Sequence, residues 1–567
     1  MRVSVKRLVV LWVILMEKRK LVSIPPFEKR IPDDVYNKLE DIVWEALLAQ
    51  EKPDEFFAPF EFPFENLQKI AESDNEEYKE SIRTMADEVW SQNLWLSALL
   101  VYFILLHITN FLPTDFYKFA YVLAKFGKEK EAIALVDVYQ NLSTNKKTTY
   151  HALANFYYCA LNIPQKAIEY FEKFIELDNT NALAYNSVGH LYSDIDVPDS
   201  LEKQLYYFKK AYELAPNDPN FVKSLLTVYE KMHNTEKIKE FYPKLIELAH
   251  TPRHALNYGL YEFSWGNIQK GCSYFQERFE LEKYPVGYPK DVLTVSNKWN
   301  YKDDISDKTL LIHYEEGFGD SIMYSRFLPL IKQYSKKVVL VVQDKLVDLF
   351  KNSPIISDGI EIFSNVNDAL NYIGKNAYLH MPMMDLPYPL GVDSCFIPYP
   401  DKYLQEKNQL EIDNNVYKIG IAYSGDVSAN YDGRDIELKE FFPLAKIDGV
   451  QLYSFQVGET AKVLNDLPTD INIVDLGKEF DTFLDTANAL ASMDLFVTTD
   501  NVLLNLAGAL GVKTFGIFNK YPNYRWFDLS GNDVVWYKSV KPFQCVTEND
   551  WSEVMKRVIS GVKSDIS

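Results

Sequence analysis

The sequence predicts an α + α/β protein, in which an array of paired helices precedes two α/β halves with parallel sheets. Through residues 113–290, small and large apolar residues recur at helical spacing, with a period of roughly 34 residues. After residue 290, short runs rich in β-branched residues alternate with helical segments, as in parallel α/β folds. We expect four parts, at residues 1–112 (helical), 113–290 (repeat array), 291–405 (first half) and 406–567 (second half).

The composition and net charge of the chain limit the kinds of partner that it can bind. The chain has 567 residues, of which 47% are hydrophobic and 25% charged, as in globular proteins. Its formal net charge of −20 argues against nucleic acid or an anionic membrane as partner, because phosphate binding needs clustered Lys and Arg. Such a balance leaves room for a small basic site that holds one diphosphate.

The four cysteines are widely spaced and form no CxxC pair, which favours a reducing, cytoplasmic location. Neither an HExxH motif nor a carboxylate cluster of metal-ligand type is present in the sequence.

Two apolar runs raise the question of a membrane span. The first, residues 8–16, is shorter than the roughly 20 residues that a span needs. It lacks a small-residue cleavage site after it, and Met16 is a candidate start of the chain. The second, residues 94–112, contains His107 and Asn110 and continues into the repeats, so we expect a buried helix. We therefore predict no stable membrane span.

The clearest repeat unit spans residues 150–179. One helix is spaced by His151, Ala154 and Tyr158, and the next by Ala167 and Phe171. The period and the small–large pattern resemble tetratricopeptide repeats, which form a curved solenoid with a concave face. Such an array can serve as a scaffold only or as a groove that binds a protein partner, and the pattern favours neither.

Predicted strands alternate with helices in both α/β halves. The first half is expected to have strands at 310–313, 338–342, 360–363 and 377–380. The second half is expected to have strands at 418–423, 452–456, 473–476, 495–498 and 514–518. Its helices are expected at 438–446, 480–492, 502–510 and 550–559.

The first candidate site is the turn after the first of these strands, in KTLLIHYEEGFGDSIMYSRFLPL at 308–330. A strand, a turn with Gly317 and Gly319, and a helix beginning near Asp320 can bring backbone N–H groups close to an anionic ligand. The simpler interpretation is an ordinary turn in which Asp320 caps the helix.

A second turn of the same kind follows residues 495–498. Asp500 and Asn501 lie between this strand and an Ala-rich helix. Two such units far apart in sequence suggest two doubly wound halves that enclose a binding cleft.

The blocks SGDVSANYDGRD, SFQVGE, DTANALASMDLFVTTDNVLLNLAGALG and YPNYRWFDLSGNDVVWYKSVKPFQC extend these two turns. Together with the repeats and with KGCSYFQERFELEKYP, they resemble bacterial tetratricopeptide proteins with a C-terminal glycosyltransferase-like domain. That domain is similar to the lipopolysaccharide heptosyltransferases, whose two Rossmann-like halves form a GT-B fold. The layout also resembles that of flagellin glycosyltransferases. The resemblance covers roughly residues 113–545.

The resemblance implies sugar transfer from a nucleotide-sugar, without a metal or a bound cofactor, to a protein or glycan acceptor recruited by the repeats. It implies that Asp320 is the general base on the acceptor side, in the loop with Gly317 and Gly319. It also implies a set of donor-binding residues, in which Arg434 neutralises the leaving phosphate: Gly425, Arg434, Gln456, Asp500, Asn501 and Asn505.

Two positions depart from the family pattern, because Asn501 stands where the family has Thr and Asn505 where it has His. An asparagine at 505 supplies no positive charge. The alternative function is therefore a catalytically degenerate domain in a protein-binding scaffold. Asp320, Arg434 and Asp500 favour the enzyme, whereas Asn501 and Asn505 favour the scaffold.

Overall fold

The computed structural model describes residues 31–48, 76–108, 111–281, 297–411, 415–425, 433–526 and 534–566. The chain forms two compact units, Met1–Ala249 and His250–Ser567. The apolar run at 8–16 lies outside the described residues.

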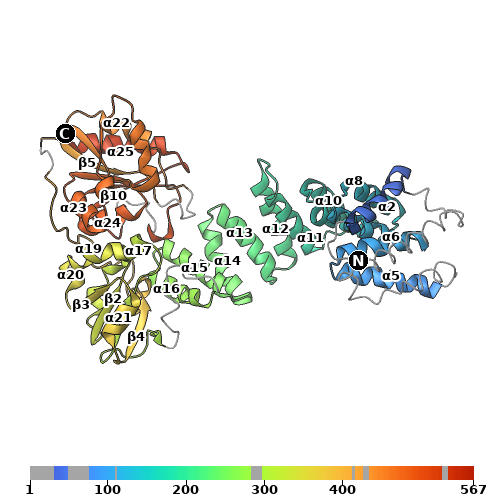
Figure 1. Cartoon of the computed structure of the whole chain (residues 1–567), viewed down its shortest axis with the longest axis horizontal. Helices are drawn as coiled ribbons and strands as arrows, with labels where there is room; N and C mark the ends of the chain where they lie inside the picture. The colour runs from blue at the N-terminus through green and yellow to red at the C-terminus, as the bar shows by residue number, and fades with distance from the viewer. Residues whose placement is uncertain are drawn as a thin grey trace. The chain divides into compact units, whose positions relative to one another are not determined.

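The first unit is helical and ends in a succession of helix pairs (Figure 1). The pairs begin at Pro113, Lys146, Ala182 and Pro219, which confirms the predicted repeat. Its helices are α2 (Asp33–Leu48), α5 (Glu76–Ser91), α6 (Trp95–Ile108), α7 (Pro113–Lys125), α8 (Glu129–Leu142), α9 (Lys146–Asn155), the π-helix η1 (Phe156–Ala160), α10 (Pro164–Leu177), α11 (Ala182–Ser193), α12 (Ser200–Leu214), α13 (Pro219–Lys231) and α14 (Thr235–Leu248).

Small residues set the spacing within the pairs. Ala167 in α10 is fully buried. At Gly189 in α11, a Cβ atom would lie 2.4 Å from the ring of Phe208 in α12. Because any side chain at this position would meet an aromatic ring, the glycine is needed for the close approach of the two helices.

Within the apolar run at 94–112, residues 95–108 form α6, which is buried in the helical core with α2, α5 and α7. This placement confirms the expected buried helix. No helix within the described part of the chain is both long and apolar enough to cross a bilayer.

The second unit begins with one more helix pair, α15 (Pro252–Ser264) and α16 (Ile268–Phe275), followed by the 3₁₀ segment η2 (Gln276–Glu280). Phe263, Ile268 and Phe275 of this pair share a hydrophobic core with the α/β halves. The pair therefore packs as part of the α/β unit, although its sequence continues the repeat.

The first α/β half is built on a four-stranded parallel sheet of order β3-β2-β1-β4. Its elements are β1 (Thr309–His313), α17 (Phe318–Ser325), α18 (Leu328–Ile331), β2 (Lys337–Val341), η4 (Asp344–Leu346), α19 (Val347–Lys351), α20 (Pro354–Ser357), β3 (Ile360–Phe363), α21 (Val366–Ile373), β4 (Tyr378–Pro382) and η5 (Met383–Asp385).

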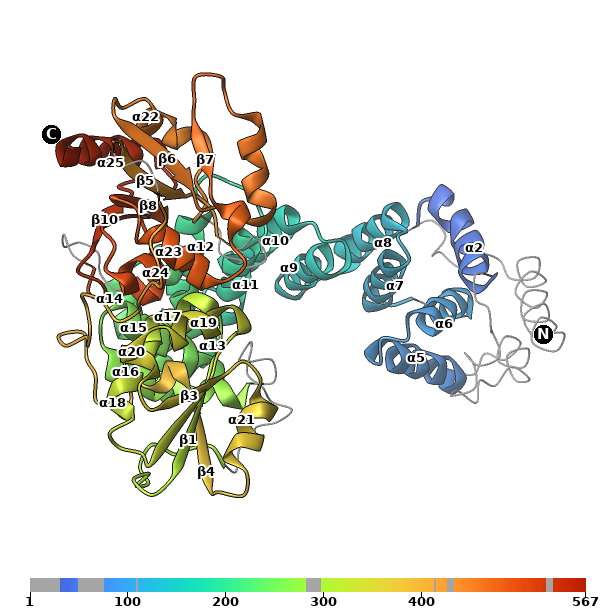
Figure 2. The same ribbon diagram turned by 60° about the vertical axis from the view of Figure 1, so that its left-hand side comes forward.

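Successive side chains of its strands alternate between two cores, as a period of two requires. Leu310 and Ile312 face the large core shared with α17 to α20. Leu311 faces a smaller core with Val366 and Ala369 of α21 (Figure 2). Helices thus cover both faces of the sheet, which explains why β1 is buried along its whole length and β2 along most of it.

The second half is built on a six-stranded parallel sheet of order β10-β9-β8-β5-β6-β7. Its elements are β5 (Tyr417–Ala422), η6 (Leu438–Phe441), α22 (Phe442–Ala445), β6 (Val450–Ser454), η7 (Gly458–Asp466), β7 (Ile473–Asp475), η8 (Gly477–Glu479), α23 (Phe483–Leu490), β8 (Leu495–Thr499), α24 (Val502–Leu510), β9 (Thr514–Phe518), η9 (Tyr524–Trp526), β10 (Val540–Gln544) and α25 (Trp551–Ile566).

The predicted strands and helices of both halves are present, although several bounds differ; β4 and β6 are shifted by up to two residues, and α25 continues to Ile566. β10 was not expected, because Pro542 interrupts its run of β-forming residues. The helix expected at 438–446 is a 3₁₀ turn followed by the short helix α22, and the helix expected at 480–492 is limited to α23. Pro443 lies in the middle of the first of these and falls in the first turn of α22, where its missing N–H group is tolerated.

Candidate functional site

The turn between β1 and α17 holds Asp320 in the first turn of the helix. Its Oδ2 atom accepts a hydrogen bond from the backbone N–H of Gly317, at 3.1 Å, so Asp320 caps the helix start. Only 8% of Asp320 is exposed. Glu316 adopts a positive φ of 63°, and its carbonyl accepts a hydrogen bond from Gln343 on the next βα connection. Capping is therefore one role of Asp320.

Gly319 brings this turn against the second half. A Cβ atom at this position would lie 3.1 Å from the Nδ2 atom of Asn505 and 3.7 Å from the Cα atom of Val502, both in α24. The first turn of α17 and the first turns of α24 are therefore in close contact. The predicted acceptor-side and donor-side residues thus lie next to each other.

The order of strands in the second sheet places the donor-side residues at its topological switch point. From β5 the chain passes outward to β6 and β7, and it then returns to β8 on the other side of β5. Parallel α/β sheets bind ligands beyond the carboxyl ends of the two strands at such a point. The connection after β5 carries Gly425 and Arg434, and the turn after β8 carries Asp500 and Asn501.

Gln456 holds the connection after β5 in place. Its Oε1 atom accepts hydrogen bonds from the backbone N–H groups of Tyr423 and Ser424, and its Nε2 atom donates to the Ser424 carbonyl and to Thr460. Gly425 donates its N–H to Asp435 at 3.0 Å. Gln456 is buried, and these bonds give it a positioning role at the edge of the site.

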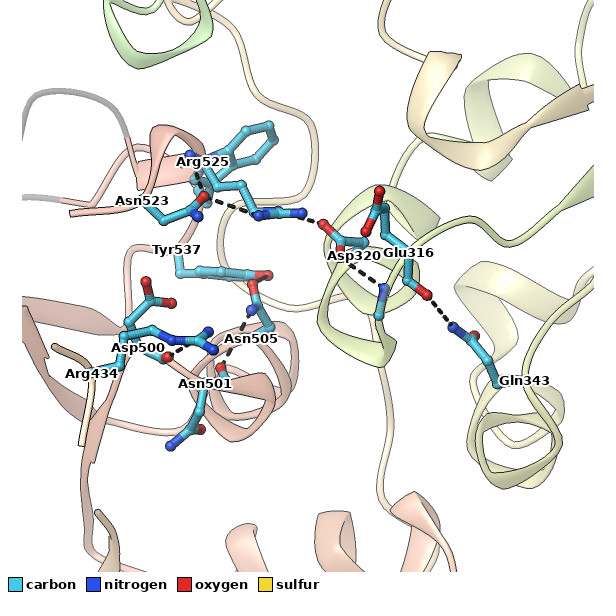
Figure 3. A network of polar contacts seen from close by, with 12 residues as sticks. Glu316, Asp320, Gln343, Arg434, Asp500, Asn501, Asn505, Asn523, Arg525 and Tyr537 are labelled. Carbon is cyan, nitrogen blue, oxygen red and sulfur yellow. Dashed lines mark hydrogen bonds and ion pairs between the residues drawn. The ribbon is translucent and has the colours of Figure 1, made fainter. Parts of the chain in front are cut away.

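Arg434 and Asp500 form the charged part of this edge. The Nη1 atom of Arg434 donates to the backbone carbonyl of Asp500 at 3.4 Å (Figure 3). Burial raises the pKa of the Asp500 carboxyl, while Trp526, Arg434 and Arg525 oppose that rise. The guanidinium of Arg434 thus lies beside the turn that begins α24.

Asn501 and Asn505 use their side chains within the protein. The Oδ1 atom of Asn501 accepts from the backbone N–H groups of Leu503 and Leu504, and its Nδ2 atom donates to the hydroxyls of Thr498 and Thr499. Asn505 accepts a hydrogen bond from the hydroxyl of Tyr537 at 2.9 Å. Asn501 is an N-cap in this structure, and it satisfies helix amides to which an anion could otherwise bind.

Arg525 is the residue of the site that sequence reasoning missed. It lies in η9, after β9, and its Nε atom is 2.5 Å from Oδ1 of Asp320 across the two halves. Figure 3 shows the side chain of Arg525 extending from the second half toward Asp320 on α17. The block containing YRWF contributed to the family resemblance, but nothing in its spacing pointed to Asp320.

A second charged cluster fills the switch point of the first sheet. In that sheet the chain leaves β1 toward β2 and β3 and returns to β4 on the other side. Glu315, which follows β1, and Asp385, which follows β4, both contact the guanidinium of Arg278 from η2, at 2.7 and 2.8 Å. All three side chains are at most 1% exposed. The equivalent crevice of the first half is therefore occupied by the protein itself.

The guanidinium of Arg278 faces two carboxyl groups, and the largely buried ammonium group of Lys298 interacts electrostatically with both of them. The hydroxyl of Tyr301 donates to Asp385 at 2.5 Å. Burial raises the pKa of Glu315 to about 7, and the nearby Asp385 adds to that rise. One carboxyl group of the cluster thus holds a proton below neutral pH. Sequence reasoning missed Arg278, because its partners lie far away in the chain.

Within the described part of the chain, no group of three or more His, Cys, Asp or Glu side chains is arranged to hold a metal ion. The metal independence of the predicted reaction stays a prediction.

No family model matches this sequence. The chain is 22% identical to Protein FlbA of Caulobacter vibrioides (strain ATCC 19089 / CIP 103742 / CB 15) over 301 residues, which cover 47% of this chain and 48% of FlbA. It therefore spans about half the length of the curated relative that it matches.

Several solved structures align with part of the chain. MamA from Desulfovibrio magneticus RS-1 is 19% identical, with a TM-score of 0.26, over 31% of this chain and 97% of MamA. YrrB, described as a TPR protein with an unusual peptide-binding site, is 21% identical, with a TM-score of 0.27, over 34% and 96%. PilF of Pseudomonas aeruginosa is 12% identical, with a TM-score of 0.30, over 37% and 94%. At these TM-scores the likeness says nothing about ligands or partners.

Proposed function

We propose that the unit His250–Ser567 is a glycosyltransferase of GT-B type, which moves a sugar from a nucleotide-sugar to a protein or glycan acceptor. The main support for the proposal is that residues of both halves lie close together at the topological switch point of the six-stranded sheet. Arg434 and Asp500 lie beyond the ends of β5 and β8, and Asp320 lies across the contact between α17 and α24. A ligand site built from two α/β halves requires this arrangement.

The residues divide the chemistry between the halves. The acceptor hydroxyl gives its proton to Asp320 while its oxygen forms a bond to the anomeric carbon of the sugar. The bond between that carbon and the diphosphate oxygen breaks, and the electron pair leaves with the nucleoside diphosphate. Arg434 offsets the negative charge that develops on this leaving group.

The repeats supply the acceptor in this proposal. Large apolar side chains are exposed on the helix pairs of the first unit, including Leu183 in α11 at 68% and Tyr206 in α12 at 55%. Exposed apolar side chains of this size suit contact with a protein partner when they gather on one surface. In this proposal the helix pairs bind either the protein acceptor or a protein partner separate from the acceptor.

The alternative is a degenerate domain in a protein-binding scaffold, and the side chains of Asn501 and Asn505 favour it. Both are occupied by partners within the protein. A transferase with this pattern must draw its affinity for the diphosphate from Arg434 and from other cations. A scaffold needs no such affinity.

A thermal-shift screen separates the two functions. We expect the full chain to be stabilised by one nucleoside diphosphate, with EDTA present, because a ligand that binds only the folded state raises its stability by mass action. The panel contains UDP, GDP, ADP and CDP, their monophosphates and their common sugar conjugates. If none of these nucleotides shifts the unfolding midpoint, with or without magnesium, the result contradicts the glycosyltransferase function and favours the scaffold function.

A further inference from the structure

The ion pair between Arg525 and Asp320 joins the two halves at the proposed reaction centre. Its side chains are only 15% and 9% exposed. Arg525 is also held by residues of its own half. Its Nη1 atom donates to Asn523 at 3.0 Å, and its guanidinium lies over the ring of Tyr524. Its backbone carbonyl accepts a hydrogen bond from the indole of Trp536 at 2.5 Å. The guanidinium is thus positioned by η9 and directed at Asp320.

Both carboxylate oxygens of Asp320 are engaged in this arrangement. Oδ1 contacts the Nε atom of Arg525, and Oδ2 accepts from the N–H of Gly317. The cap on Oδ2 belongs to the local helix start, whereas the contact on Oδ1 reaches into the other half. An acceptor hydroxyl that donates to Asp320 must therefore share an oxygen that already accepts one of these two bonds.

A diphosphate meets a cluster in which both guanidinium groups already lie near carboxyl groups. The carboxyl group of Asp500 interacts electrostatically with Arg434, Arg525 and Asp320, which places two cations and two anions near one another. Asn501 already accepts from the N–H groups of Leu503 and Leu504 at the start of α24. A further anion therefore gains most if one guanidinium changes partner, because charge-assisted bonds to phosphate are strong and directional.

We propose that Arg525 is a second diphosphate-binding residue, and that it exchanges Asp320 for the donor's diphosphate when the donor binds. The inference rests on the proposed function. Breaking the pair frees Oδ1 of Asp320 to accept the proton of the acceptor hydroxyl. The donor thus prepares the base, and the productive order of binding is donor first and acceptor second. The transfer itself then follows the bond changes given above, with the proton on Asp320 and the electron pair on the departing nucleoside diphosphate.

The exchange predicts that a variant without the Asp320 carboxylate binds nucleoside diphosphate more tightly. We would measure the affinity of the full chain by isothermal titration calorimetry, using the diphosphate selected by the thermal-shift screen. Asp320→Asn should tighten binding by about fivefold, the upper range for a partly exposed ion pair, because Arg525 no longer has to leave a carboxylate. Arg525→Ala should weaken binding, and in the double variant the gain from Asp320→Asn should vanish.

Two controls keep the result specific. Asp358→Asn removes an exposed aspartate of the same half that pairs with Lys332 at 2.7 Å, and it should leave the affinity unchanged. It corrects for the overall loss of one negative charge. Asp320→Ser serves as a second carboxylate-free variant if Asp320→Asn fails to fold, as judged from its unfolding midpoint.

The outcomes separate this inference from the proposed function. Equal or weaker binding in the carboxylate-free variants, with wild-type binding intact, would overturn the exchange and leave the donor site standing. A gain of the same size in Asp358→Asn, or one that persists without Arg525, would also overturn it. An absence of binding to every nucleotide in the wild-type chain would remove the proposed function and the exchange with it.

Discussion

At the scale of residues, Asp320 has two roles that can be separated. It caps α17 through Oδ2, and it meets Arg525 through Oδ1. An amide in its place keeps the shape of the side chain and an oxygen for the cap, but it cannot accept a proton at neutral pH.

Turnover of Asp320→Asn should therefore fall by roughly two to four orders of magnitude, the usual contribution of a general base. The measurement is release of nucleoside diphosphate from the sugar donor in the presence of the acceptor. Asp358→Asn is the matched control and should retain full turnover. Near-normal turnover in a folded Asp320→Asn variant would place the base elsewhere.

The buried cluster of Arg278, Glu315 and Asp385 predicts a pH dependence of stability. The pKa of Glu315 is raised to about 7 in the folded protein, so the folded state holds a proton that the unfolded chain has already lost above about pH 4.5. The stability contributed by that proton is complete below the unfolded value and is lost as the pH rises through about 7.

We expect the unfolding midpoint of the His250–Ser567 unit to fall by a few degrees more between pH 5.5 and 8 in the wild type than in Glu315→Gln, with about 2 to 4 °C expected per kcal/mol. The neutral amide removes the carboxyl group whose pKa is raised, so the slope should flatten even if the variant is less stable overall. Calorimetric scans across this range provide the test. Parallel slopes in the two proteins would show that no carboxyl group of the cluster titrates near neutrality.

The chain positions of the site residues show which parts of the site the sequence can predict. Asp320, Asp500 and Asn501 follow strands in a strand–turn–helix pattern, and the local pattern alone locates them. Arg525 and Arg278 find their partners 205 and 37 residues away in the chain. Local spacing holds no information about such pairs, since the tertiary fold alone brings them together.

At the scale of elements, close approach of helices depends on single glycines. A Cβ atom at Gly189 would lie 2.4 Å from the Phe208 ring, a distance that requires the ring, or the helix that carries it, to move. Gly189→Ala should therefore destabilise the Met1–Ala249 unit by about 1 to 3 kcal/mol, the usual effect of overpacking, although alanine favours helices.

Urea unfolding followed by circular dichroism measures this change. Ser187→Ala is the control, because Ser187 lies two residues away in α11 and is only half-buried. A stabilised Gly189→Ala variant would mean that the two helices do not pack as closely as described.

Element boundaries were predictable where the pattern of apolar residues is strong and less so elsewhere. The strands β1, β3, β8 and β9 match their expected positions within a residue, because each is a short run of mostly β-forming residues between turns. β10 was missed because Pro542 weakens its pattern, yet its neighbour β9 provides a complete partner edge. Residues 540–544 form a strand because they pair with β9, although their own β-propensities are weak.

At the scale of the whole molecule, the helix pair α15/α16 belongs with the α/β halves. Leu256, Phe263 and Phe275 contribute to the core of the second unit, and Arg278 is buried against Glu315 and Asp385. Repeat periodicity alone would assign this pair to the array, because the helical pattern is the same before and after the boundary between Ala249 and His250.

A chain of residues 250–567 should fold and bind nucleoside diphosphate as tightly as the full protein. A chain of residues 291–567 should be insoluble or unfolded, because it loses Arg278 and leaves two buried carboxyl groups without their counter-charge. Circular dichroism and calorimetry on the two truncations compare them directly. Equal folding of both would show that the helix pair is dispensable for the α/β halves.

The truncated chain of residues 250–567 also tests whether the repeats recruit the acceptor. If they recruit the acceptor, the chain of residues 250–567 keeps nucleotide binding and loses modification of the natural acceptor. Normal modification by this truncation would assign the repeats a different task.

The central claim is that the second switch point binds a nucleoside diphosphate, and Arg434→Ala tests it most directly. Calorimetric titration of the diphosphate selected by thermal shift should show at least about tenfold weaker binding in this variant, since a charge-assisted bond to phosphate is lost. Arg557→Ala removes an exposed arginine of α25 that pairs with Glu553, and it should bind like the wild type. Unchanged affinity in Arg434→Ala would contradict the assignment of the site.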